Sequence, residues 1–170
     1  DRESIHIALK AAHSGHMVFS TLHTTNSYMA LERIRDEGGD LFILAYSLSG
    51  VIAQRLVQKL CDCKIPSSSE KGKNYFKSDK FGFEKKGCVR CDFSGYGQRT
   101  LLTDVVLIPP DIKTRYGFYM ALKNSTVLSV WDNLITFSYF ESAKHLFEQG
   151  LCDYDTLISE LLSLGYVDEN

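Results

Sequence analysis

Four cysteines lie in two close pairs that flank one polar segment of the chain. Cys61 and Cys63 form a C-x-C pair, and Cys88 and Cys91 form a C-x-x-C pair. The segment between them, 66–87, is rich in lysine, serine and glycine and has too few apolar residues for a core of its own. Four thiolates around one Zn²⁺ supply the folding energy that such a segment lacks. The pattern predicts a structural zinc site, with a disulfide or four unrelated cysteines as the alternatives.

A second group of polar side chains ends an apolar stretch, in the sequence GHMVFSTLHT at 15–24. Residues 16–23 are apolar and β-branched enough to predict a buried strand. Thr21, His23 and Thr24 would then lie at the carboxyl end of that strand, where open α/β sheets bind their ligands. Hydroxyl and imidazole groups placed there donate hydrogen bonds to a phosphate. The alternative is that this threonine-rich run caps the following helix.

The other histidines and the fifth cysteine have simpler explanations. His6, His13 and His145 fall in segments with helical periodicity and have no ligand partners nearby in the sequence. We expect them to be packing or surface residues. Cys152 stands alone and is expected to be a small buried residue.

The first part of the chain predicts helices around the expected strand. Apolar residues at helical spacing predict a helix over 2–15, and a second helix over 25–39 has Thr25 or Asn26 as its N-cap. The stretch 40–61 is apolar on nearly every side until Gln54. A helix of that character is usually part of a core, so a core helix broken near Gly50 is predicted there.

The second part begins with a strand and ends in helices. Residues 99–108 predict a strand that Pro109 and Pro110 terminate, because proline cannot continue a central ladder. The remainder, 111–170, reads as helices that end at glycines such as Gly150 and Gly165. Strands flanked by helices indicate the α/β class.

Composition narrows the classes of function. With 170 residues and 44% hydrophobic content, the chain is long enough for one packed domain or for one domain with a small appendage. Its formal charge of -2 argues against nucleic acid as a partner. No apolar run reaches the about 18–20 residues of a membrane span, and no secretory signal is evident, so we expect a cytoplasmic protein. The chain starts without methionine, from which we expect it to be part of a longer one.

Several separated motifs, in order, resemble one known family. They are DRESIHIALKAAHSGHMVFSTLHT, ALERIRDEGG, SLSGVIAQRLVQKLC and GCVRCDFSGYGQRTLLTDVV, and together they span about residues 1–107. They are similar to the C-terminal half of the ATPase domain of the type II secretion and type IV pilus assembly ATPases. The resemblance implies a RecA-like fold and a hexameric ring.

The resemblance also implies roles for particular residues. Asp1 matches the end of the Walker B segment. His16 and His23 match the two histidines of the His box, which implies a catalytic role for both and makes His23 the residue that reports the γ-phosphate. Thr21 and Thr24 in the same box, and Arg55 in VIAQRL, are implied nucleotide contacts. For Arg55 the alternatives are a contact between subunits and a charge at a helix C-terminus. The four cysteines match the tetracysteine zinc module of the assembly and secretion members.

This sequence departs from the family pattern at a few positions. The first cysteine pair is C-x-C where the family has C-x-x-C, and Thr25 stands where asparagine is common. Gln98 and Asp104 replace the usual glycine and glutamate. No G-x-x-x-x-G-K-[S/T] loop is present, so the chain lacks the amides and the lysine that hold the β- and γ-phosphates. We do not expect this chain alone to hydrolyse ATP.

The implied parent is therefore a motor that couples ATP hydrolysis, with magnesium, to type IV pilus assembly or type II secretion. Its partners would be its own copies and an inner-membrane platform protein, which places it in the cytoplasm at the inner membrane. In this interpretation 1–60 is a partial ATPase core, 61–92 the cysteine module, 93–110 a returning core strand and 111–170 a helical region.

Two alternatives remain at the level of sequence. One is a small zinc-stabilised module that binds a partner through the lysines and aromatic residues of 71–86, a run that otherwise reads as a solvated loop. The other is a conjugation or retraction motor of the same class.

Overall fold

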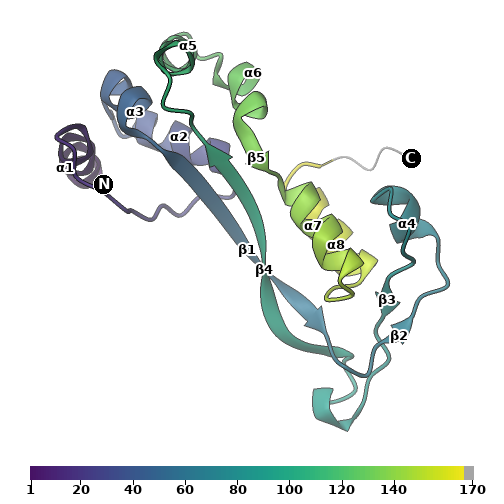
Figure 1. Cartoon of the computed structure of the whole chain (residues 1–170). Coiled ribbons are helices and arrows are strands. Elements are labelled where there is room, and N and C mark those ends of the chain that lie inside the picture. Colours follow the sequence, from purple (N-terminus) through teal and green to yellow (C-terminus); the bar gives the residue numbers. More distant parts are fainter. Residues whose placement is uncertain (167–170) are drawn as a thin grey trace. The chain divides into compact units, whose positions relative to one another are not determined.

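The computed structural model describes residues 1–166, and these form two compact units (Figure 1). The first unit contains Asp1–Ala53 and Asp104–Thr136, and the second contains Gln54–Thr103 and the chain from Phe137 onward. Two long strands, β1 (Gly50–Leu60) and β4 (Tyr96–Leu107), contribute residues to both units. The sheet that they form has the order β1-β4-β5, with β5 at Ile135–Phe137.

The first unit is mainly helical. Its helices are α1 (Arg2–His13), α2 (Ser27–Asp36), α3 (Leu41–Ser47), α5 (Ile112–Lys123) and α6 (Val127–Trp131), followed by the short 3-10 turn η2 (Asp132–Leu134). α3 packs against α1 and α5. The core of the unit consists of buried residues that these helices share with the end of β4: Leu31, Leu44, Ala45, Val106, Ile108, Phe118, Ala121, Leu122, Val127 and Trp131.

The buried Arg115 ties this core together. Its guanidinium donates hydrogen bonds to the carbonyl oxygens of Ala45, Leu48 and Ile108, at the ends of α3 and β4. Burial lowers the pKa of Arg115, but three carbonyl acceptors compensate the buried charge. One side chain thus satisfies carbonyl groups that the secondary structure leaves unpaired.

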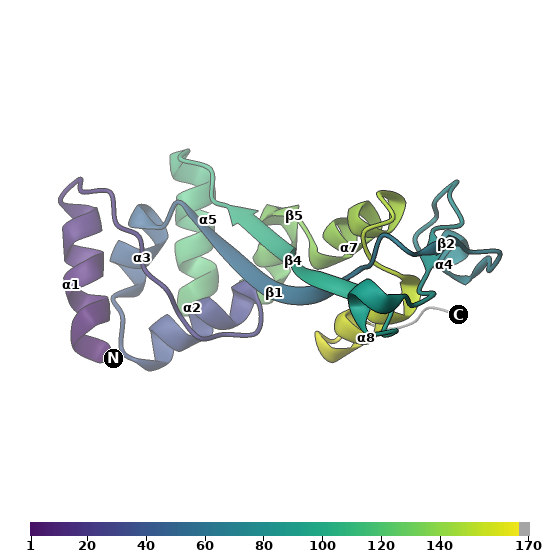
Figure 2. The ribbon, with the colours of Figure 1, turned by 90° about the horizontal axis from the view of Figure 1, so that it is seen from below.

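The second unit surrounds the polar segment between the cysteine pairs. It contains β2 (Ile65–Pro66), α4 (Lys71–Tyr75), β3 (Phe83–Glu84), the 3-10 turn η1 (Val89–Cys91), α7 (Tyr139–Glu148) and α8 (Tyr154–Ser163). β2 and β3 pair antiparallel, with Ile65 opposite Glu84. Figure 2 shows α7 and α8 lying side by side, and they are in contact. Both helices begin at residues whose side chains cap them: a Ser138–Glu141 capping box for α7, and Asp153 for α8.

Most helices predicted from the sequence are confirmed. α1 and α2 lie within their predicted spans, and Asn26, one of the two predicted N-caps, caps α2. α7 and α8 fall in the region predicted to be helical and end just before Gly150 and Gly165, and β4 overlaps the strand predicted over 99–108. Within residues 1–166, none of the helices combines the length and apolar character that crossing a lipid bilayer requires. The division into four regions by motif stays a prediction.

Three predictions about secondary structure are wrong. Residues 16–23 form no strand: they are exposed, and none of the described strands pairs with them. A strand needs a ladder partner for its backbone groups, and apolar composition does not supply one. The predicted core helix ends at Ser47, and 50–60 form the strand β1. β5 interrupts the helices predicted after 111.

Candidate metal centre and histidine loop

The four predicted cysteines come together at one point of the second unit. The Sγ atoms of Cys61 and Cys88 are 4.0 Å apart, as are those of Cys63 and Cys91, and those of Cys88 and Cys91 are 3.8 Å apart. All four sulfur atoms lie within 4.8 Å of one another. Four thiolates about 2.3 Å from a tetrahedral Zn²⁺ would be about 3.8 Å apart. The separations fit a zinc site and exclude disulfide bonds among these residues as they stand.

Backbone geometry positions the two pairs. Cys61 follows the last residue of β1, and its N–H donates to the carbonyl of Gly95, just before β4, at 2.9 Å. Cys88 is the N-cap of η1, which brings Cys91 back toward it. Gly95 has φ +79°, and a Cβ there would lie 2.6 Å from that of Lys85, so only glycine fits this return.

The thiols at this centre are tuned in opposite directions. Burial raises the pKa of Cys91, but backbone N–H groups of Cys88 and Gly95 outweigh it and lower the pKa to about 6. Burial raises the pKa of Cys63 to about 11, since neighbouring sulfurs reinforce it and an N–H of Gly87 opposes it only in part. N–H donors of this kind are what stabilise zinc-bound thiolates. Cys152, in contrast, is fully buried, as predicted, and burial raises its pKa to about 12.

The segment between the cysteine pairs is packed rather than solvated. Phe76, after α4, is fully buried, with ring centroids 5.1 Å from Phe147, 5.6 Å from Phe140 and 6.4 Å from Tyr154. Gly82, with φ +77°, lies so close to Phe147 that a Cβ would approach its ring to 2.3 Å. The aromatic residues considered for partner docking are therefore largely used inside the unit.

Two lysines of this segment also cap the end of α7. Lys80 Nζ donates to the carbonyl of Glu148 at 2.8 Å, and Lys64 Nζ donates to that of Gly150 while lying over the ring of Phe83. Cations are favourable at a helix C-terminus, where carbonyl groups lack partners. No local pattern in the sequence predicts these contacts, and the nearest signal is the mixture of lysines and aromatic residues between the cysteine pairs.

The histidine loop, residues 14–26, connects α1 to α2. Ser14 Oγ lies 3.0 Å from Nδ1 of His16 at one end, and Asn26 Oδ1 accepts from the N–H of Met29 at 2.8 Å at the other. His16, Thr21 and His23 are exposed, and Thr24 is half-buried. The N-cap of α2 is thus Asn26, and the hydroxyl of Thr24 donates to the carbonyl of Asn26 at 3.4 Å.

The other two predicted site residues, Asp1 and Arg55, form their contacts with residues outside this loop. The carboxylate of Asp1 accepts from the N–H of Ser4 at 2.8 Å as the N-cap of α1. Arg55 lies in β1, not at a helix C-terminus, which excludes the helix-charge alternative. Its guanidinium is 3.5 Å from the carboxylate of Glu160 in α8.

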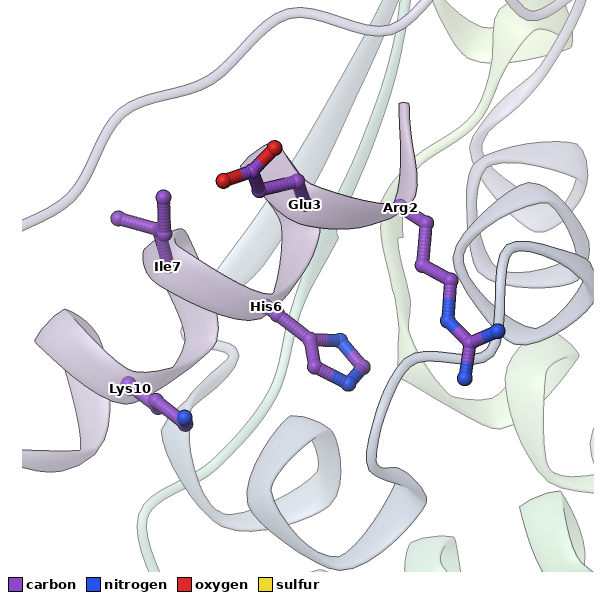
Figure 3. Close-up of a pocket in the computed structure, with 5 residues that line it drawn as sticks. All are labelled: Arg2, Glu3, His6, Ile7 and Lys10. Carbon is purple, nitrogen blue, oxygen red and sulfur yellow. The ribbon is translucent and has the colours of Figure 1, made fainter.

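An open cavity of about 410 Å³ borders α1 (Figure 3). It is lined by Arg2, Glu3, His6, Ile7 and Lys10, which all come from that helix. Nδ1 of His6 is buried and has no hydrogen-bond partner within residues 1–166. The cavity contains none of the predicted ligands, and its lining from a single helix gives it no enclosed binding geometry.

Comparisons with known sequences point to one family. The family described as "Type II/IV secretion system protein" matches residues 1–147. The type II secretion system ATPase E of Vibrio cholerae is 40% identical over 114 residues, which cover 64% of this chain and 23% of that protein. The protein transport protein HofB homolog of Escherichia coli K12 is 34% identical over 170 residues, 95% of this chain and 35% of that protein. The chain thus spans about a quarter to a third of the length of these relatives.

Comparison with solved structures gives the fold. The X-ray structure of the Legionella pneumophila ATPase DotB matches with a TM-score of 0.62 and 19% sequence identity. The match covers 98% of this chain and 37% of that one. The chain therefore has the mixed α/β fold of a part of that protein.

Proposed function

The chain belongs to the type II/IV secretion system protein family, and on this premise we propose that it is the C-terminal part of a RecA-like motor ATPase. The observation that carries the proposal is the family match over residues 1–147, a range that includes the histidine loop and the four cysteines. The parent protein would hydrolyse ATP with magnesium and use the energy for type II secretion or type IV pilus assembly.

The histidine loop would supply the nucleotide-sensing part of this machine. The imidazole of His23 is exposed on the loop and is therefore placed to donate to a phosphate oxygen. The hydroxyl of the half-buried Thr24 donates to the carbonyl of Asn26 at 3.4 Å, and it would exchange that long bond for one to a phosphate. His16 and Thr21 belong to the same loop and would assist in binding. Loss of the γ-phosphate would remove the donors' acceptor and release the loop, as in other phosphate-dependent switches.

Arg55 and Asp1 would serve beside the nucleotide in the assembled protein. The ion pair of Arg55 with Glu160 spans 3.5 Å and leaves about a third of each side chain exposed. A partly exposed pair of this kind is weak, so it can exchange for a phosphate or for a carboxylate of a neighbouring subunit. Asp1 would continue the Walker B segment from upstream residues.

The cysteine centre would have a structural role. Cys61, Cys63, Cys88 and Cys91 would hold Zn²⁺, which supplies tetrahedral cross-linking to the segment between the pairs. The same segment caps α7 through Lys64 and Lys80 and buries Phe76. We expect zinc to stabilise the packing of α7 as well as the cysteine loops.

The setting of the parent protein is also proposed. It would act as a homohexamer in the cytoplasm, held at the inner membrane by a platform protein. The alternative of a small docking module has less support, because Phe76 is fully buried and its neighbours in the segment contact α7.

Metal analysis tests the zinc centre. The purified chain is expected to contain about one zinc ion, and Cys91→Ser is expected to lose most of it. Cys152→Ala is the matched control, because that cysteine is buried outside the cluster and should leave zinc content unchanged. Equal zinc loss in both variants would contradict the assignment.

Turnover measurements test the motor. The longer protein that contains a P-loop is expected to release phosphate from ATP, whereas the 170-residue chain alone should not, since it has no such loop. Hydrolysis by the isolated chain would refute the proposed division of the site.

A further inference from the structure

A buried polar network joins the end of the histidine loop to β4 within the first unit. Oδ2 of Asp104 accepts from the hydroxyl of Ser27 at 2.5 Å and from its backbone N–H at 3.4 Å. The indole N–H of Trp131 donates to Oγ of Ser27 at 3.2 Å. Relative exposure is 5% for Asp104, 2% for Ser27 and 1% for Trp131, so all three groups are shielded from water.

Ser27 is the residue at which the loop ends and α2 begins. From His16 to Thr24, the backbone hydrogen bonds outside the helices and strands lie at the two ends: the N–H of His16 donates to the carbonyl of Ala11 at 3.1 Å, and that of Thr24 donates to Leu22 at 3.2 Å. The side chains there are exposed, including Met17 and Phe19 at 83% and 90%. The loop therefore depends on its ends for its position.

The hydrogen bond from Ser27 to Asp104, which anchors the end of the loop, is stronger than the capping of a helix requires. A hydroxyl that donates to a carboxylate forms a charge-assisted bond, and such bonds are shorter and stronger than neutral ones. Removing the carboxylate would leave the buried Ser27 hydroxyl and N–H without their acceptor, which is costly. Asp104 also has a second oxygen, Oδ1, that is buried and accepts no bond from residues 1–166. A buried carboxylate with spare acceptor capacity is costly to keep, which indicates that Asp104 is retained for the groups that it holds in place.

We propose that Asp104 is a positioning residue for the nucleotide-sensing loop: it fixes Ser27 and thereby the place of Thr24 and His23. The catalytic part of this inference rests on the proposed function, but the anchoring does not. Asp104 lies too deep to touch nucleotide, so it acts through Ser27.

Hydrogen exchange on the chain itself tests the anchoring. In Asp104→Ala, amides of 27–30 are expected to exchange at least about tenfold faster, relative to those of α5, than in the unchanged chain. Asp104→Asn keeps an acceptor for Ser27 and is expected to lie much nearer the unchanged chain. Val127→Ala is the control, because it truncates a buried residue of the same core and should speed exchange in both regions alike. A uniform effect in Asp104→Ala would overturn the anchor, and Ser27→Ala provides the same test if Asp104→Ala does not fold.

Turnover by the longer protein tests the consequence. Asp104→Ala is expected to lower kcat at least about tenfold while KM for ATP changes little, because the P-loop that binds the phosphates is elsewhere. If His23→Ala lowers kcat and Asp104→Ala does not, the positioning role is refuted. If exchange changes locally but neither variant alters kcat, the anchor stands and the sensing role proposed for His23 fails.

Discussion

Phe76 provides the sharpest test of how the cysteine segment is held. Its ring is fully buried, and three aromatic side chains of α7 and α8 surround it at 5.1 Å, 5.6 Å and 6.4 Å between centroids. Replacing a buried phenylalanine by alanine removes its transfer free energy and leaves a cavity, which typically costs about 3–5 kcal/mol. We expect Phe76→Ala to destabilise the second unit by about that amount.

The assay must separate the two units. Trp131 is the only tryptophan of the chain and lies in the first unit, so its fluorescence follows unfolding there. Exchange of the α7 amides follows the second unit. Phe76→Ala should accelerate amide exchange in α7 about 100-fold or more. Phe81→Ala is the control and should change it much less, because the Phe81 ring is 42% exposed and lies under Lys73. Equal effects of the two variants on α7 would refute the packing described here.

Two further predictions follow from buried and titrating groups. Arg115→Met should destabilise the first unit, measured by Trp131 fluorescence in denaturant, because three carbonyl groups lose their donor at about 1–3 kcal/mol for each buried group left unsatisfied. A loss under about 1 kcal/mol would contradict that role. After zinc is removed with a chelator, Cys91 should alkylate fastest with a midpoint near pH 6, since its lowered pKa makes it a thiolate above that pH. Among the four clustered cysteines, Cys63, with its pKa raised to about 11, should react last, and the reverse order would contradict the geometry.

The sequence was most informative where local chemistry decides structure. The N-cap of α2 and the glycine that ends α7 depend on neighbouring residues alone: Asn26 was one of two predicted caps, and Gly150 was predicted as the stop. The four cysteines were also predicted to meet, because a segment without a core needs a cross-link.

The sequence predicted a helix where the strand β1 forms, because the spacing of the buried residues in this strand resembles that of a helix. In β1 the buried residues are Ala53, Val57 and Leu60, a spacing of four and three that imitates one face of a helix. Ile52 and Leu56 on the other face are apolar yet 63% and 59% exposed, so the alternation typical of a half-buried strand is absent.

Local sequence patterns do not predict contacts between residues that are far apart in the chain. Nothing near Phe76 indicates that its ring meets Phe147, and nothing near Asp104 indicates Ser27, because both pairs are separated by more than 70 residues. The strand expected at 16–23 failed for a related reason, since a strand depends on a partner that its own sequence does not specify.

The central claim is that this chain carries the phosphate-sensing loop of a secretion motor, and ATP turnover by the longer protein with His23→Ala tests it most directly. Removing one donor to developing charge commonly costs about 10²–10³ in kcat, so a fall of at least about tenfold is expected. His13→Ala is the matched control, because that histidine is exposed at the end of α1 and should leave turnover within about twofold. Unchanged turnover in His23→Ala, or an equal loss in His13→Ala, would contradict the account.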